Sequence, residues 1–251
     1  MACYVSEPSS DLTSLTVPCR AQAPGAASGD VATTLTRLAI ELPPSVIANE
    51  TVHGPLDELT RERCDRDAIL QLANALAQAG YRREAATAQI SFSSQCGGYV
   101  PALRGAVNVL LKLSDFAAAE TIASDLIKLD PYDDNGYFLR ALARDGAQSY
   151  KSAIDDYITA VELFGDKAHI SSVSYYNMAR DYERLGKFCN AMLPLEQWIA
   201  LDPSRHQTSK TQAMLSTYAA QGGCAAATSG STESFPAAPP RRGGQGPSRR
   251  Q

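Results

Sequence analysis

The stretch NMARDYERLGKFCNAMLPLEQWIALDP (residues 177–203) contains two segments with apolar residues at helical spacing, separated by a turn at Gly186. Its last three letters, LDP, also end the segment IKLDP at residues 127–131. A proline cannot continue a helix, and it biases the preceding residue away from the helical conformation. LDP is therefore interpreted as the end of a packed helix. The stretch as a whole predicts two helices that bury their apolar faces against each other.

The same pattern recurs along the chain. Small residues suited to a helix crossing are separated by 34, 34 and 38 positions, and a turn is expected five residues before each of them. The crossing residues are Ala85, Ala119, Ala153 and Ala191, and the turn positions are Gly80, Ser114, Gln148 and Gly186. Units are predicted to begin near residues 66, 100, 134 and 172, with an inserted loop of four residues before the last. The segment 204–221 is predicted to be a capping helix.

This period and these positions resemble the tetratricopeptide repeat, a helix-turn-helix unit of 34 residues. The resemblance implies an all-α fold: a right-handed superhelix of about four tetratricopeptide-like helix pairs plus a capping helix. Pro131 and Pro203 close the second and fourth units, whereas the first unit lacks the closing proline and the third lacks the turn glycine.

Composition divides the chain into three parts. Residues 1–63 are predicted to be an irregular or disordered N-terminal region with one short amphipathic helix at 31–42, residues 64–224 the helical repeat domain, and residues 225–251 a disordered tail rich in Ala, Gly, Pro and Arg. A net charge of -4 gives no reason to expect a nucleic-acid partner. No segment approaches the roughly 20 apolar residues of a membrane span.

The inner wall of such a superhelix is lined by the first helix of each unit and binds extended peptides or partner helices. Asparagine can bond a peptide backbone, arginine can bind a carboxylate, and aromatic rings can serve as apolar anchors. The candidates for binding a protein or peptide are Asn74, Arg104, Asn108, Asn135, Phe138, Tyr176 and Arg180. Arg104 and Asn108 resemble the first half of the carboxylate clamp of chaperone-binding tetratricopeptide domains. The second half is absent, because Leu139 and Val173 occupy two of the expected polar places. A spacer without a ligand is the alternative.

Four cysteines flank the ends of the helical region. Cys64 and Cys96 should meet at the open end of the first helical hairpin, and Cys189 and Cys224 at the opposite end of the array. Two such disulfides would contribute roughly 3 to 4 kcal/mol each and would imply an oxidising compartment. The alternative is unpaired thiols in a cytosolic protein, which the poor signal-peptide character of the N-terminus as written favours. The placement of the cysteines thus favours a periplasmic or exported protein, and a cytoplasmic one is expected if the N-terminus is as written. No metal site is predicted, because the chain has no CxxC and its three histidines lie far from each cysteine pair in the repeat frame.

A second resemblance covers residues 63–235. The strings CDRDAILQLANALAQAGYRREAA, CGGYVPALRGAVNVLLKLSDF, SDLIKLDPYDDNGYFLRALA and NMARDYERLGKFCNAMLPLEQWIALDP resemble the helical half of bacterial retropepsin-like aspartic proteases. That resemblance implies a catalytic Asp-Thr-Gly or Asp-Ser-Gly triplet in a second, β-rich half, and this chain contains neither triplet. It also contains no GxSxG, P-loop, HExxH or GxGxxG motif. The sequence therefore predicts a non-catalytic binding scaffold without a cofactor. The alternative is the recruiting or regulatory half of a protease whose catalytic domain is encoded elsewhere.

Overall fold

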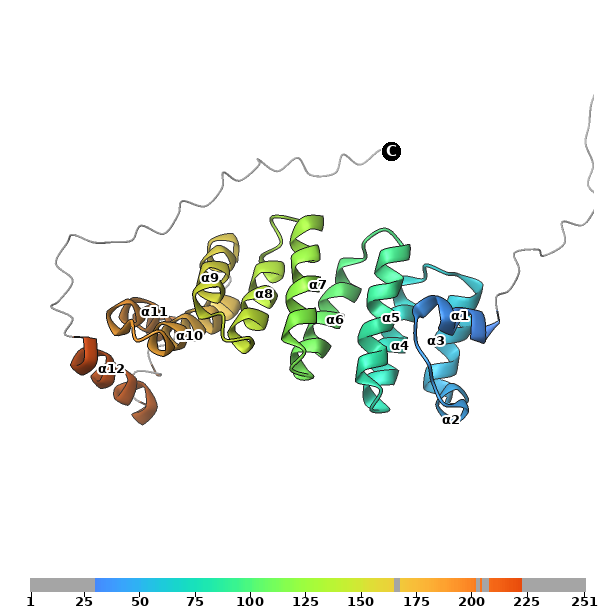
Figure 1. The fold of residues 1–251 in the computed structure, drawn as a ribbon, viewed down its shortest axis with the longest axis horizontal. Coiled ribbons are helices and arrows are strands. Elements are labelled where there is room, and N and C mark those ends of the chain that lie inside the picture. The colour runs from blue at the N-terminus through green and yellow to red at the C-terminus, as the bar shows by residue number, and fades with distance from the viewer. Residues whose placement is uncertain (1–29, 165–167, 202–203, 205–207, 223–251) are drawn as a thin grey trace, which may run out of the picture.

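The computed structural model describes residues 30–164, 168–201, 204 and 208–222, and within these ranges every regular element is a helix (Figure 1). The predicted all-α array of helix pairs is confirmed. In chain order the helices are α1 (Val31–Leu38), α2 (Pro44–Ile47), α3 (Glu50–Arg61), α4 (Arg66–Gln78), α5 (Arg82–Gln95), α6 (Val100–Lys112), α7 (Phe116–Leu129), α8 (Asp134–Gly146), α9 (Tyr150–Phe164), α10 (Ala168–Arg184), α11 (Phe188–Ala200) and α12 (Ser209–Gly222).

The four predicted repeat units correspond to the pairs α4/α5, α6/α7, α8/α9 and α10/α11. Aspartates begin several of these helices, because a carboxylate accepts the backbone N–H groups that a first helical turn leaves unpaired. Asp65 accepts from the N–H groups of Asp67 and Ala68, and Asp133 caps α8. Figure 1 shows α4 to α9 standing side by side, whereas α10 and α11 lie across that direction at one end of the array.

The predicted turn positions share one backbone conformation. Gly80, Ser114, Gln148 and Gly186 all have a positive φ, of 92°, 58°, 62° and 68° respectively. Each first helix therefore ends in a left-handed residue that turns the chain into the second helix. Two of the four turns meet this requirement without glycine, which is why the repeat is hard to see from glycine spacing alone.

The predicted crossing residues are fully buried. Ala85, Ala119, Ala153 and Ala191 are all 0% exposed. Each buried apolar cluster is shared by successive helices, so that Ala86 of α5 packs with α6 and α7, and Ala141 of α8 packs with α9 and α10. The core therefore extends along the array and is not concentrated at one centre.

The unit boundary before α10 differs from the prediction. The sequence spacing of 38 indicated an inserted loop of four residues, but α10 has 17 residues where α4, α6 and α8 each have 13. The connection between α9 and α10 comprises only residues 165–167, which lie outside the described residues. The additional residues thus lengthen the helix by about one turn.

The prediction of an irregular N-terminal region is wrong for residues 44–61. The expected helix at 31–42 is present as the shorter α1, but α2 and α3 follow it, and Val52, Leu56 and Leu59 of α3 are fully buried. These residues pack with Ile69 and Leu72 of α4 in the first core cluster. The helical region therefore begins well before residue 64, and α1 to α3 cover the first end of the array.

The opposite end is covered by α12, close to the predicted capping segment. Met214 and Tyr218 are buried apolar residues of α12, and they pack against Ala191 and Leu195 of α11. The Tyr218 hydroxyl donates to Glu183 Oε2 at 3.1 Å. The predicted tail, residues 225–251, lies outside the described residues. Among the helices that the structure does describe, none is both long enough and apolar enough to cross a bilayer.

Candidate functional site

The predicted binding residues belong to the first helices α4, α6, α8 and α10. Asn74 near the middle of α4 and Asn108 in α6 are separated by one repeat, and both side chains are exposed. Neither makes a hydrogen bond within the described residues. Asparagine is a weaker helix former than alanine or leucine. These two residues therefore serve neither the helix nor the core, and their amide groups face solvent.

Arg104, one turn before Asn108, is used inside the array. Its Nε donates to Asp133 Oδ2 at 3.3 Å, and Nη2 binds the other carboxylate oxygen. The Asp133 side chain is 5% exposed and also accepts from the backbone N–H of Asn135. Arg104 therefore ties α6 to the start of α8. A carboxylate ligand would have to compete with a buried internal carboxylate for this guanidinium.

The two candidates on α8, Asn135 and Phe138, also make contacts within the array. The Asn135 side chain donates to Asp134 Oδ1 at 2.8 Å, so it stabilises the start of the helix. Phe138 is half-buried, and its ring lies 6.1 Å from that of Tyr157 on α9. Leu139, one of the two places where a clamp residue was missing, is buried in the core. The carboxylate clamp suggested by Arg104 and Asn108 is therefore not completed on α8.

Several donors of α10 and α12 surround the Tyr176 side chain. Tyr176 stacks on Trp198 with ring centres 5.0 Å apart, and Arg180 Nη1 donates to the Tyr176 hydroxyl at 3.4 Å. Lys210 Nζ lies 4.9 Å from the centre of the Tyr176 ring. Burial alone would raise the pKa of Tyr176, but hydrogen bonds and positive charge from Lys210 and Arg180 lower it overall. Arg180 also lies 3.3 Å from Glu183, so this end of the wall carries two cations and one anion around an aromatic ring.

Lys210 was not predicted from the sequence. It lies on the capping helix, which the repeat frame treats only as a cover for the last core cluster. The repeat itself could have indicated it. Helix α12 follows α11, the second helix of the last unit, and so takes the place that the first helix of a fifth unit would occupy. Applying the frame one unit beyond α11 would have placed residues of α12 beside Tyr176.

The two arginines of α8, Arg140 and Arg144, are structural. Arg140 donates to both oxygens of Asp156 at 2.8 and 2.7 Å, and the pKa of Arg140 is raised by this hydrogen-bonded carboxylate. Arg144 binds Glu120 at 2.7 Å and Asp156 at 2.8 Å. The Asp156 side chain is 5% exposed. These ion pairs join α7, α8 and α9. Both arginines of α8 are therefore engaged in internal contacts and are not available to a ligand.

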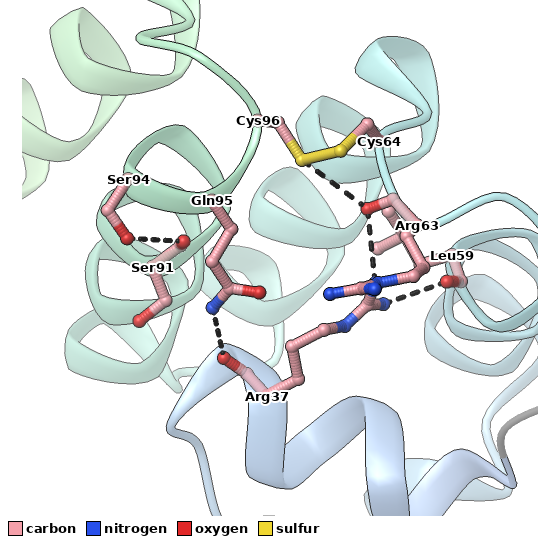
Figure 2. The surroundings of a disulfide bond; sticks show 8 residues. All are labelled: Arg37, Leu59, Arg63, Cys64, Ser91, Ser94, Gln95 and Cys96. Atoms are coloured by element: carbon pink, nitrogen blue, oxygen red, sulfur yellow. Dashed lines mark hydrogen bonds between the residues drawn. A yellow bond between two sulfur atoms is a disulfide. The ribbon is translucent and has the colours of Figure 1, made fainter.

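The structure joins Cys64 and Cys96 by a disulfide with a Cα separation of 5.6 Å (Figure 2). Cys96 ends α5, and Cys64 lies just before α4, so the bond closes the open end of the first repeat pair. Around it, Arg37 of α1 donates to the carbonyl oxygens of Leu59 and Arg63 at 2.8 and 3.3 Å. The disulfide region thus also anchors the N-terminal helices.

At the other end, Cys189 is engaged in a disulfide. Its predicted partner, Cys224, lies outside the described residues, and that pairing stays a prediction.

Reactive constellations are not found in the described part of the chain. No three residues of the His, Cys, Asp and Glu types converge there as metal ligands. A shallow cavity of about 320 Å³ lies between α5, α6 and α7, and it is lined mainly by small and aliphatic side chains with the Arg83–Asp115 ion pair at its margin. Its lining contains no nucleophile paired with a base.

Comparisons with known proteins reveal similarity of fold. The chain is similar to the crystal structure of MamA, with a TM-score of 0.54 and 14% identity over 62% of this chain and 90% of that one. It is also similar to residues 41-end of MamA from Desulfovibrio magneticus RS-1, with a TM-score of 0.54 and 22% identity over 73% of this chain and all of that one. A third similar structure is YrrB, described as a TPR protein with an unusual peptide-binding site; the TM-score is 0.53, with 14% identity over 76% of this chain and all of that one.

These likenesses establish a tetratricopeptide-like fold and, at such low identity, nothing further. No family model matches the chain, and no curated protein matches it. The resemblance to the helical half of retropepsin-like proteases therefore finds no support in the comparisons.

Proposed function

We propose that this chain is a non-catalytic scaffold that binds an extended peptide or a protein segment along the wall formed by α4, α6, α8, α10 and α12. This wall is called the groove wall below. The observation that carries the proposal is the pair of exposed, unbonded asparagines at equivalent places of successive repeats, Asn74 and Asn108. Their amides have both donors and acceptors, which is what an extended peptide backbone requires.

The aromatic residues farther along the groove wall are also related by the repeat. Phe138 and Tyr176 occupy equivalent places on α8 and α10, and both are half-buried. A partly exposed aromatic ring can anchor an apolar side chain of a partner at low entropic cost. Polar groups at one end and aromatic anchors with Lys210 and Arg180 at the other give the wall a direction, so a bound peptide would have a preferred orientation.

The experiment selects 12-residue peptides from a phage-displayed library on the full chain with its disulfides intact. Enriched peptides are synthesised and titrated by isothermal calorimetry against two variants. The groove variant carries Asn74→Ala, Asn108→Ala and Lys210→Ala, all exposed positions of the groove wall. The control variant carries Arg82→Ala, Thr121→Ala and Gln197→Ala, three exposed positions on second helices. These choices spare Arg104 and Phe138, whose removal would disturb internal contacts.

Selected peptides should bind the groove variant at least about tenfold more weakly, a loss of about 1.4 kcal/mol, and the control variant unchanged. Equal binding to both variants, or a library that yields no binding peptide, would contradict the proposal. The alternative function, the recruiting half of an aspartic protease, is not favoured by any contact or comparison described above.

A further inference from the structure

The junction between the third and fourth units contains a buried acidic cluster that the binding site does not use. Helices α8 and α10 both pack on α9 and have little direct backbone contact with each other. The array also changes direction at this junction (Figure 1). A direct link between α8 and α10 is made by Arg184 of α10, which binds Asp145 of α8. The set Asp145, Asp181 and Arg184 is called the acidic joint below.

Asp181 is the unusual member of the acidic joint. Its side chain is 0% exposed, and only its Oδ1 receives a hydrogen bond, from Arg184 Nη1 at 2.9 Å. No donor reaches Oδ2 within the described residues. The Asp145 and Asp181 carboxyl groups both bind Nη1 of Arg184, so their oxygens meet at one guanidinium nitrogen. A proton shared by the two carboxyl groups would provide the missing donor, and it would leave one negative charge opposite the single arginine.

Among the residues that the structure describes, no second cation pairs with Asp145 or Asp181. From α9, the Tyr150 ring lies 5.1 Å from the Arg184 guanidinium, and the buried Tyr157 hydroxyl accepts from Asn177 at 2.9 Å. Burial raises the pKa of Tyr157 above its ordinary value, so this phenol stays neutral. Arg180, the preceding arginine of α10, contacts Tyr176 and Glu183 instead. With both carboxyls ionised, the acidic joint carries one uncompensated negative charge.

We propose that the acidic joint is a pH-sensitive connection: it holds α8 to α10 while one proton is shared between Asp145 and Asp181, and it loosens when that proton is lost. Two ionised carboxylates in one poorly solvated place repel each other, and a buried unpaired charge is costly. The groove wall crosses this joint, with Phe138 on one side and Tyr176 on the other. Peptide binding would therefore weaken as the joint loosens, a consequence that rests on the proposed function, whereas the joint itself does not.

The direction of the effect follows from linkage. Burial, together with the charge and hydrogen bond of Asp145, raises the pKa of Asp181 from 3.8 to about 7, although Arg184 opposes the change. The folded chain thus retains a proton at pH 5 to 6 that the unfolded chain has released. The stabilisation is fully present below the ordinary pKa and is lost as pH rises through about 7. Between pH 3.8 and about 7, the ratio of folded to unfolded joint falls by at most about tenfold for each pH unit.

The test uses hydrogen exchange on the full chain without ligand, measured by mass spectrometry at about pH 5.5 and about pH 8.5 and corrected for the intrinsic exchange rate. Protection of α8 and α10 should fall at least about tenfold at the higher pH, while protection of α4 and α5 stays constant. Asp181→Asn, which cannot ionise, should abolish the pH dependence. Asp125→Asn, at a half-exposed surface pair with Lys128, is the control and should leave it intact.

A second variant keeps the test decisive if Asp181→Asn does not fold. Arg184→Gln removes the cation that pairs with both carboxylates, so the midpoint of the transition should move to higher pH, a shift that lost packing alone would not produce. Constant protection of α8 and α10 across the range in the wild type, or an unaltered transition in Asp181→Asn, would overturn the proposal.

A separate arm titrates a library-selected peptide at both pH values. Weaker binding at high pH in the wild type, but not in Asp181→Asn, supports the link between the joint and the groove wall. Equal affinity at the two pH values overturns that link and leaves the binding function standing. Absence of binding at both values counts against the proposed function alone, since the exchange measurement needs no peptide.

Discussion

The turns of the array allow a prediction about stability: a glycine substitution should raise the free energy of unfolding at one position and lower it at the position next to it. Ser114 and Gln148 have φ of 58° and 62°, a conformation that costs a residue with a Cβ roughly 1 to 2 kcal/mol. Glycine avoids this cost but loses about 0.5 to 1 kcal/mol more chain entropy on folding. The difference predicts that Ser114→Gly and Gln148→Gly each stabilise the protein by about 0.5 to 1 kcal/mol.

The reverse substitutions isolate the backbone contribution. A Cβ added at Gly80 or at Gly186 would meet no atom within 4 Å, so any effect comes from φ and not from a clash. Gly80→Ala and Gly186→Ala should therefore each lower the free energy of unfolding by about 1 kcal/mol. The matched control is Ala147→Gly, immediately before Gln148, because Ala147 is exposed and has an ordinary φ of -79°. Glycine there should cost about 0.5 to 1 kcal/mol.

The assay is urea-induced unfolding followed by circular dichroism, with midpoints compared among variants of equal slope. If Gln148→Gly were as destabilising as Ala147→Gly, or if Gly186→Ala were neutral, the left-handed requirement would not govern these turns.

Two further predictions concern internal links. Replacing both Cys64 and Cys96 with alanine removes a cross-link with a sequence separation of 32. By chain entropy this change should lower the free energy of unfolding by about 4 kcal/mol, as measured by chemical denaturation. A loss below about 1 kcal/mol would mean that the N-terminal contacts of Arg37 hold this end of the array closed without the disulfide. Arg104→Ala leaves the buried Asp133 carboxylate without its arginine and should lower the free energy of unfolding by about 1 to 3 kcal/mol. Arg61→Ala, at an exposed pair with Asp57, is the control and should lower it by less than about 0.5 kcal/mol. Thermal melts measure both changes, and equal effects would refute the internal role of Arg104.

The sequence was informative where the repeat constrains a residue locally. A helix crossing requires a small side chain, and the turn that precedes it lies a fixed number of residues earlier, so Ala119 and Ser114 could be placed by counting. Helix α3 could not be found in this way, since it precedes the first full repeat and contains a Gly-Pro pair at residues 54 and 55. Its burial depends on Ile69 and Leu72, which only the folded array brings to it.

Binding residues were harder to predict, because side-chain partners are not periodic. Arg104 occupies a groove position in the repeat frame, yet its partner Asp133 is 29 residues later and is buried. Lys210 lies outside the four counted units and still reaches Tyr176. Position in the repeat predicts which way a side chain points, but whether that side chain is already bound depends on charges in the neighbouring unit.

The acidic joint shows how one departure from the repeat produces a distinct local chemistry. A strict 34-residue spacing brings each first helix past its predecessor at the same height, so apolar contacts can be reused from unit to unit. The extra turn of α10 shifts its start by about 6 Å along the helix axis, and α10 lies across the direction of α8 in Figure 1. Besides the apolar cluster that Ala141 shares with Met178, long polar side chains link α8 to α10, with Arg184 extending to Asp145 beside the buried Asp181. The irregular junction therefore brings two carboxyl groups to one arginine, whereas the polar link at the preceding junction pairs Arg104 with Asp133.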